Sequence, residues 1–190
     1  MDGSQRALEH LTAVAMGDSE LAARSLHPAN HNHMAADEPP ACAEPGLPGL
    51  MATSAWLRLA FADLRFELIE TAADGERIMA HVWMRGRQTG PFVVFPPDGR
   101  PVAFPPTGRE FAVRQCHVSR LRDNLFAEHI AVRDDLGMMT QLGHLPPSPA
   151  GILRMAKWQI TGAQGRAVAA AIVAVQQAAD TVRKPADITR

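Results

Sequence analysis

Two histidines on consecutive predicted strands are the first candidates for chemistry. His117 lies within residues 111–120, and His129 lies in the next run, residues 125–133. Asn124, between the two runs, suits the positive φ of a tight turn. Because strand side chains alternate between faces, a hairpin of these runs can bring both rings to one sheet face. Neutral imidazoles take up or donate protons near pH 7, so the pair predicts acid/base chemistry. The alternative is two half-buried histidines that bond to backbone.

These residues need a scaffold, and the upstream sequence predicts helices and strands that could supply it. Apolar spacing predicts helices over residues 5–16 and 50–61, with a second short helix running to about residue 26. Alternation predicts strands over residues 64–71 and 76–85, joined by a hairpin at Asp74-Gly75. Apolar residues on both faces of these strands indicate a sheet that is covered on both sides. Residues 35–49, rich in proline, read as an irregular loop. His81 and Trp83 share one strand face, which either lines a cavity or packs as core.

The last part of the chain reads as a separate helical segment. Ser148 and Pro149 suit the start of a helix, as N-cap and first helical residue, and two glycines, Gly162 and Gly165, interrupt it. A narrow apolar seam then follows, made of Val168, Ile172, Val175, Ala179 and Val182. We expect this tail helix to pack on its own domain or on a dimer partner. The sequence therefore predicts a first domain over residues 1–146 and a helical extension over residues 147–190.

Composition narrows the range of functions. The chain has 190 residues and a formal net charge of −1, which argues against a phosphate-binding surface and so against nucleic-acid binding. The two cysteines have no paired spacing that would indicate a zinc ribbon or a disulfide scaffold. The apolar run at residues 167–175 is too short to span a membrane, and the first residues lack a signal-peptide layout, so we expect a cytoplasmic protein. With no tyrosine in the sequence, an oxyanion must be held by other side chains or by backbone N–H groups.

A metal site is the weaker interpretation of the histidine-rich early loop. His27, His31, His33, Asp37 and Glu38 lie close in sequence, but Zn²⁺ needs three or four convergent ligands. Clustered loop histidines are more often solvated, so no metal is expected.

An ordered set of motifs resembles one known family. PPTGR is followed by a strand with histidine, the pair Glu128-His129, then Asp-x-Leu-Gly and Gln-Leu-Gly. Upstream, PANHNH (28–33), AFADLRFELIE (60–70) and GRQTGPF (86–92) fit the same order. Together they are similar to the SnoaL-like polyketide cyclases, also labelled ester cyclases, over roughly residues 5 to 146. The resemblance implies an α+β NTF2-like cone, with N-terminal helices over a curved antiparallel sheet, and acid/base chemistry without a cofactor. Residues 95–104 look like an inserted hairpin that turns at Asp98-Gly99.

One departure from the family pattern affects the expected mechanism. In members that close a ring by aldol condensation, the motif continues to an aspartate that acts as acid/base, and the matching position here is Ala131. A methyl group cannot transfer a proton. Asp134 is the nearest carboxylate along the chain. It either substitutes for the aspartate, orients a histidine, or caps the helix predicted over residues 136–142, which Gly143 would end.

The resemblance also implies residues that bind substrate. Asn32 and His33 match an early-loop position at which asparagine can donate to a substrate carbonyl, although an Asx turn is the alternative. Trp56, His81, Trp83 and Ala131 complete the expected lining, although the position of Trp56 on its helix favours the core.

These observations lead to three readings of function. The first is an enzyme that abstracts a proton next to a carbonyl of a hydrophobic, carbonyl-rich substrate and then closes a ring or isomerises it. The second is a ligand-binding module without catalysis, which Ala131 favours. The third is a cofactor-free hydrolase or hydroxylase. An epoxide hydrolase would need paired carboxylates around an arginine, and Arg133 shares the face of His129 but has no evident second acid in the sequence. A homodimer or higher homo-oligomer is expected in each case.

Overall fold

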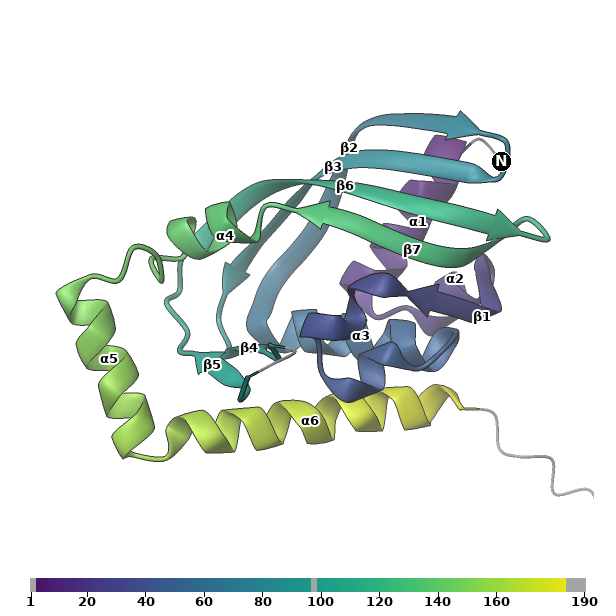
Figure 1. Cartoon of the computed structure of the whole chain (residues 1–190). Helices are drawn as coiled ribbons and strands as arrows, with labels where there is room; N and C mark the ends of the chain where they lie inside the picture. Colours follow the sequence, from purple (N-terminus) through teal and green to yellow (C-terminus); the bar gives the residue numbers. More distant parts are fainter. Residues whose placement is uncertain (1–2, 97–98, 184–190) are drawn as a thin grey trace, which may run out of the picture.

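A curved five-stranded sheet arches over the N-terminal helices (Figure 1). The computed structural model describes residues 3–96 and 99–183. The helical elements are α1 (Gly3–Met16), α2 (Ser19–Ala23), the 3-10 turns η1 (His33–Asp37) and η2 (Pro40–Ala43), α3 (Leu47–Ala60), α4 (Asp135–Gln141), α5 (Pro149–Ile160) and α6 (Ala163–Val182). The strands are β1 (Leu26–Asn32), β2 (Phe61–Asp74), β3 (Arg77–Gln88), β4 (Phe92–Val94), β5 (Val102–Phe104), β6 (Glu110–Arg122) and β7 (Leu125–Arg133). The predicted α+β class is confirmed.

The sheet is mixed, which corrects the expectation of a wholly antiparallel one. Its order is β1-β7-β6-β3-β2; the last four strands pair antiparallel, whereas β1 runs parallel to β7. The segment HPANHN was expected to be part of a loop because it shows no strand pattern. It becomes an edge strand, where Pro28 is tolerated, and the buried Asn30 side chain donates to the Phe126 carbonyl at 2.9 Å.

The β6–β7 hairpin has the predicted turn and register. Asp123 and Asn124 both have positive φ, 51° and 63°, as a two-residue turn of type I′ requires. His117 pairs with Ala131, and His129 pairs with Ser119. The two histidines are therefore diagonal neighbours on one face of the sheet.

The inner face of the sheet packs against the N-terminal helices. Ala7 and Leu11 of α1 join a buried cluster with the inward residues of β3, among them Ala80 and Val82. On the other side, α3 contributes Trp56 to a cluster that also contains Phe61 of β2. Since helix α1 covers one end of the sheet and α3 the other, a space remains between them and the strands.

Helix α6 packs on its own chain, along α3 (Figure 1). The buried residues of α6 are Ala171, Val175 and Ala179. Ile172, expected in the seam, is 41% exposed, so the buried stripe is rotated towards Ala171. Gly162, with a φ of 69°, separates α5 from α6, whereas Gly165 lies within α6 instead of breaking it. The domain boundary at residue 146 and the expected homodimer stay predictions.

The predicted hairpin around residues 95–104 is present as the pair β4–β5. Its strands begin three residues earlier than expected, at Phe92, and Asp98 of the predicted turn lies outside the described residues. Val93 and Ala103 pack on Ala171, so the hairpin is held by α6. Over residues 3–96 and 99–183, no helix combines the length and apolar character needed to cross a membrane.

Candidate active site

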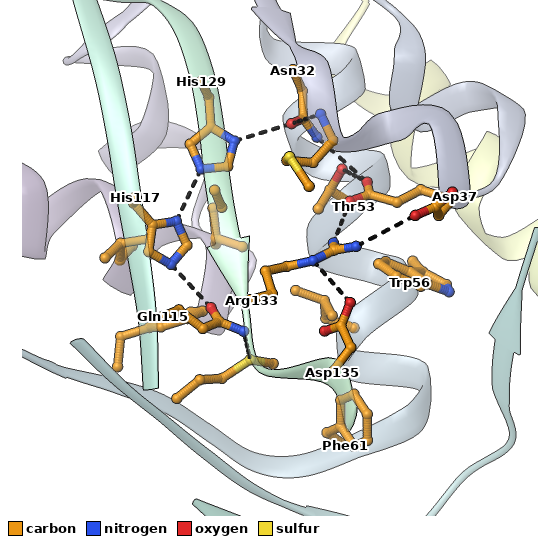
Figure 2. Close-up of a pocket in the computed structure, with 18 of the residues that line it drawn as sticks. Asn32, Asp37, Thr53, Trp56, Phe61, Gln115, His117, His129, Arg133 and Asp135 are labelled. Atoms are coloured by element: carbon orange, nitrogen blue, oxygen red, sulfur yellow. Dashed lines mark hydrogen bonds and ion pairs between the residues drawn. The ribbon is translucent and has the colours of Figure 1, made fainter. Parts of the chain in front are cut away.

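An apolar cavity of about 320 Å³ lies between the sheet, α1, α3 and α4 (Figure 2). Most of its walls are hydrocarbon and aromatic side chains, including Leu11, Val14, Trp56, Phe61, Phe66, Phe92, Phe104 and Met138. Part of its polar lining comes from β6, β7 and the end of β1, and the rest comes from α1, α3, α4 and the segment around η1 (Figure 2). A concave, mostly apolar space with a few convergent polar groups is the usual form of a small-molecule site.

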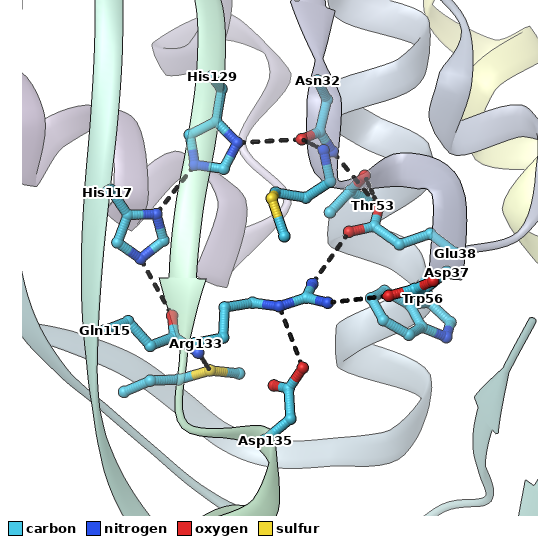
Figure 3. A network of polar contacts seen from close by, with 12 residues as sticks. Asn32, Asp37, Glu38, Thr53, Trp56, Gln115, His117, His129, Arg133 and Asp135 are labelled. Carbon is cyan, nitrogen blue, oxygen red and sulfur yellow. Dashed lines mark hydrogen bonds and ion pairs between the residues drawn. The ribbon is translucent and has the colours of Figure 1, made fainter. Parts of the chain in front are cut away.

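His117 and His129 belong to the polar lining from β6 and β7 and are hydrogen-bonded to each other (Figure 3). His117 Nδ1 is 2.9 Å from His129 Nε2. The outer nitrogens face amide oxygens: His117 Nε2 is 3.0 Å from Gln115 Oε1, and His129 Nδ1 is 3.0 Å from Asn32 Oδ1. All four ring nitrogens are therefore engaged, and the pair forms the centre of a continuous chain.

Burial keeps both imidazoles neutral at pH 7. Desolvation lowers the pKa of His117 to about 4, and the charges of His10 and Arg133 act in the same direction. Desolvation lowers the pKa of His129 well below its usual value, followed by repulsion from His117 when that ring is protonated. Part of the His129 surface is open to the cavity, although protein surrounds the ring. Neutral rings have a lone pair with which to accept a substrate proton.

A third imidazole, His10 of α1, also lines the cavity. It is buried against the ring of Phe126 at 4.7 Å between centroids, and burial lowers its pKa to about 4. Within the described part of the chain its Nδ1 has no hydrogen-bond partner. Sequence analysis placed His10 in a helix and saw no chemistry there, because a single histidine on an amphipathic helix carries no signal.

The asparagine end of the chain continues to a buried carboxylate, Glu38. Asn32 Nδ2 donates to Glu38 Oε2 at 3.5 Å, and the Thr53 hydroxyl donates to the same oxygen at 2.7 Å. Arg133 Nη1 donates to Glu38 Oε1, also at 3.5 Å (Figure 3). Burial raises the pKa of Glu38, and the donors Thr53, Arg133 and Asn32 oppose that rise.

Arg133 is surrounded by three carboxylates at one side of the cavity. Its guanidinium lies 3.5 Å from Glu38, 3.9 Å from Asp37 and 3.3 Å from Asp135 (Figure 3). The sequence showed no second acid near Arg133 because Asp37 ends η1 and Glu38 follows it, and the parallel pairing of β1 with β7 brings this distant segment alongside. The structure corrects that expectation.

Asn32, Trp56 and Ala131 line the cavity as predicted. Trp56 also satisfies the core alternative, since it is buried and its indole N–H donates to the Val93 carbonyl at 2.7 Å. The Ala131 methyl leaves this part of the wall without a carboxylate. The roles of these residues in substrate binding stay predictions.

Asp134 and His33 lie away from the cavity, contrary to expectation. Asp134 is exposed and caps α4, where its Oδ1 accepts from the Gly137 N–H at 2.8 Å, so its capping alternative is the one observed. The next residue, Asp135, is the one that lines the cavity. His33 is exposed and lies 3.5 Å from the carboxylate of Glu128, with its ring edge against His31.

His81 and Trp83 lie on the outer face of the sheet, so the prediction that they line the cavity is wrong. His81 Nδ1 is 3.0 Å from Glu70 Oε1. Trp83 lies between the guanidinium groups of Arg85 and Arg114, each 5.0 Å from its ring centroid. The neighbouring positions Ala80, Val82 and Met84 take the inner face instead.

Gln115 and Glu38 belong to the site although sequence analysis did not select them. Gln115 shared the predicted face of His117, and that alternation was a usable signal. Glu38 appeared only in the weak metal set. Its position depends on a contact between two distant segments. Among the described residues, no group of three or more histidine, cysteine, aspartate or glutamate side chains is arranged to hold a metal ion.

Several known proteins share this architecture. TsrD from Streptomyces laurentii is 29% identical and superposes with a TM-score of 0.61, covering 74% of this chain and 94% of its own. IdmH from Streptomyces antibioticus is 24% identical, with a TM-score of 0.58 and coverage of 75% and 99%. A protein from Catenulispora acidiphila with a ketosteroid isomerase-like fold is 11% identical, with a TM-score of 0.53 and coverage of 73% and 92%. IdmH and the Catenulispora acidiphila protein, each less than 25% identical to this chain, show only that the fold is shared.

Sequence comparison points the same way. The aklanonic acid methyl ester cyclase DnrD from Streptomyces peucetius is 32% identical over 101 residues, which is 53% of this chain. The aligned region spans only 63% of the length of that relative. The model of the SnoaL-like polyketide cyclases matches residues 5–142, the region that builds the sheet, the covering helices and the cavity. The chain belongs to the SnoaL-like polyketide cyclase family.

Proposed function

We propose that this protein is a cofactor-independent enzyme that cyclises or isomerises a hydrophobic, carbonyl-rich small molecule by acid/base catalysis. The observation that carries the proposal is the neutral His117–His129 pair on the wall of a largely apolar cavity. The wall around Ala131 offers no carboxylate at that position, so the histidine pair takes over as base. A carbon flanked by two carbonyls needs only a modest base.

The proposed reaction moves one proton out and back. The substrate C–H bond breaks, its proton passes to an imidazole nitrogen, and the electron pair forms an enolate. The enolate carbon then attacks a second carbonyl and forms a carbon–carbon bond. The new alkoxide takes the proton back from the imidazolium, which leaves the pair neutral. In the isomerisation variant the proton returns to a different carbon. Exclusion of water by the apolar walls strengthens each polar contact along this path.

Replacing either histidine tests the proposal directly. We expect His117→Ala and His129→Ala to lower turnover of an aromatic 1,3-dicarbonyl substrate by at least about a hundredfold, because general acid/base catalysis contributes on that scale. Turnover is measured by loss of substrate absorbance and by mass spectrometry of the product. His81→Ala is the matched control, since it removes a histidine from the outer face of the sheet. Equal losses in all three variants would contradict a role for the pair.

A non-catalytic binding module is the rival that the same assay separates. The position of Ala131, where cyclases of this family carry an acid, favours that rival. If wild-type protein turns over no member of a 1,3-dicarbonyl panel, yet ligands from the panel raise its melting temperature, the binding module is the better account.

A hydrolase is a second enzymatic candidate, and the arginine with its carboxylates favours it. Asp37, Glu38 and Asp135 surround Arg133 beside the cavity, which meets the requirement for acids paired around an arginine. Epoxide opening by wild-type protein, and its loss in Asp135→Asn, would support this candidate over cyclisation.

A further inference from the structure

The hydrogen-bond chain through the two histidines has more contacts than neutral imidazoles can fill. Three contacts link Asn32 Oδ1, His129, His117 and Gln115 Oε1. Both ends are carbonyl oxygens, which only accept. Each neutral imidazole carries one N–H, so two protons are present for three contacts. With both amide oxygens facing the rings, one contact therefore sets a nitrogen lone pair against an oxygen lone pair until a third proton is bound.

The Asn32 amide is held with its oxygen towards the rings by contacts on both of its ends. Asn32 Oδ1 also accepts from the Met34 N–H at 3.1 Å, while its Nδ2 donates to Glu38. Turning this amide would place its NH₂ group against an N–H and its oxygen against a carboxylate. Gln115 Nε2 donates to Met84 Sδ at 3.0 Å, a weaker restraint. The adjustable contact is consequently at the glutamine end: the Gln115 amide can turn its NH₂ group to the His117 Nε2 lone pair of a neutral pair, whereas a protonated Nε2 requires the oxygen there.

Behind Asn32 lies the carboxyl group of Glu38, whose pKa is raised by burial, while its hydrogen-bond donors favour the charged form. Thr53 Oγ1, Asn32 Nδ2 and Arg133 Nη1 all donate to Glu38, and its side chain is 3% exposed. A carboxylate that receives such donors acts on a protonated histidine pair in two ways. It attracts the positive charge, and it polarises Asn32 so that the carbonyl accepts more strongly from His129.

We propose that Glu38, acting through Asn32, is the positioning carboxylate that stabilises a third proton on the His117–His129 pair and so makes the pair a base. The incoming proton binds at His117 Nε2 and completes the contact with Gln115. Glu38 thereby supplies the negative charge that the family's catalytic aspartate would supply at the position of Ala131. This inference builds on the proposed acid/base function.

The proton affinity of the pair is set by opposing effects. Burial lowers the pKa of both rings, which keeps the pair unprotonated before reaction. The completed hydrogen bonds and Glu38 favour the protonated form. The other charged or titratable groups around the network are Arg133, Asp37, Asp135, His10, His33 and the Cys42 thiol, whose pKa is raised by its own burial and by Glu38. Of these, Arg133 and the neighbouring histidines act against protonation, and Asp37 and Asp135 act for it.

Titration of the full chain without substrate tests the inference independently of catalysis. Imidazole signals of protein labelled with ¹⁵N-histidine are followed as the pH falls from about 8 to about 3. We expect the pair to gain one proton in a single coupled step, and Glu38→Gln to move that step to lower pH. The control Asp37→Asn removes a carboxylate from the more exposed rim, where solvent screens it, and should move the step less. An unchanged midpoint in Glu38→Gln, an equal shift in Asp37→Asn, or a wild-type pair that stays neutral until the protein unfolds would overturn the inference.

Kinetics supply a second measurement that a purely structural role would not reproduce. Glu38→Gln should lower kcat by about tenfold to a hundredfold with little change in KM, and should move the rising limb of the pH profile to lower pH. If Glu38→Gln does not fold, Asn32→Ala breaks the same link and should move the titration in the same direction. Absence of turnover in wild-type protein would contradict the proposed function, whereas the titration alone decides the role of Glu38.

Discussion

Burial determines the chemistry of the cavity histidines one residue at a time. His10, His117 and His129 are enclosed by protein, and desolvation lowers the pKa of each. His10 differs because its Nδ1 has no protein partner within the described residues, so nothing offsets the cost of charging it. The same burial that prepares a neutral base therefore makes folding sensitive to acid.

This sensitivity has a definite sign. An unfolded histidine binds a proton below about pH 6.5, whereas folded His10 does so only near pH 4, so between these values the unfolded state binds more protons. Stability should be complete above about pH 6.5 and decline as the pH falls towards 4. Between pH 7.5 and 5, the free energy of unfolding should fall by about 1 to 2 kcal/mol less in His10→Leu than in wild type, as measured by urea unfolding at each pH. Equal losses in both proteins would contradict this account of His10.

A site residue could be predicted from the sequence only where local structure fixes its position. Alternation on adjacent strands was enough to bring His117 and His129 together, because a hairpin turn fixes the register locally. No local turn or pattern determined whether the His81 side chain lies on the inner or the outer face of the sheet. That strand carries apolar residues on both faces, so its sequence gives no contrast between the faces. Asp134 was ambiguous for a different reason, since one carboxylate can serve equally as cap or as acid.

At the scale of elements, the strand that sequence reasoning missed is the one that completes the site. Strand β1 lies parallel to β7, with Asn32 the Cα partner of His129. The turn η1 follows directly and ends at Asp37, and Glu38 is the next residue. A parallel pair is joined through a long crossover, so its register depends on packing of the whole domain and not on a local turn. Asn32 was expected at the site only through the family resemblance, and Glu38 could not be placed from sequence.

The packing of helix α6 leads to a separate prediction about the stability of the domain. Val175 is fully buried in the cluster that contains Trp56 and Phe61, whereas Val173, on the same helix, is 54% exposed. Val175→Asp should destabilise the protein by on the order of 3 kcal/mol or more, because an unpaired carboxylate would be buried. The matched variant Val173→Asp should stay within about 0.5 kcal/mol of wild type.

Urea unfolding of both α6 variants gives the comparison. Similar stabilities would mean that α6 leaves the domain in solution and that the buried contacts with α3 are not maintained there. A large loss confined to Val175→Asp would show that the C-terminal helix supports the core beside the cavity.

Across the whole molecule, the polar groups of the cavity are segregated by kind. The histidine pair lies between apolar walls, while Arg133 lies with Asp37, Glu38 and Asp135, one cation with three carboxylates. The molecule therefore combines a neutral basic centre with an acidic neighbourhood. A ligand that enters must place its uncharged carbonyls at the histidines and must not add a further negative charge near the acids.

We therefore expect the cavity to prefer a neutral ester to the corresponding free acid. For an aromatic 1,3-dicarbonyl methyl ester and its carboxylate, the ester should bind roughly tenfold more tightly and raise the melting temperature more at equal concentration. Asp135→Asn should narrow that difference, because it removes one of the repelling charges, whereas Glu67→Gln on the outer face of the sheet should leave it unchanged. Tighter binding of the free acid would mean that Arg133 turns from its carboxylates to the ligand, and the cavity would then select anions through that arginine.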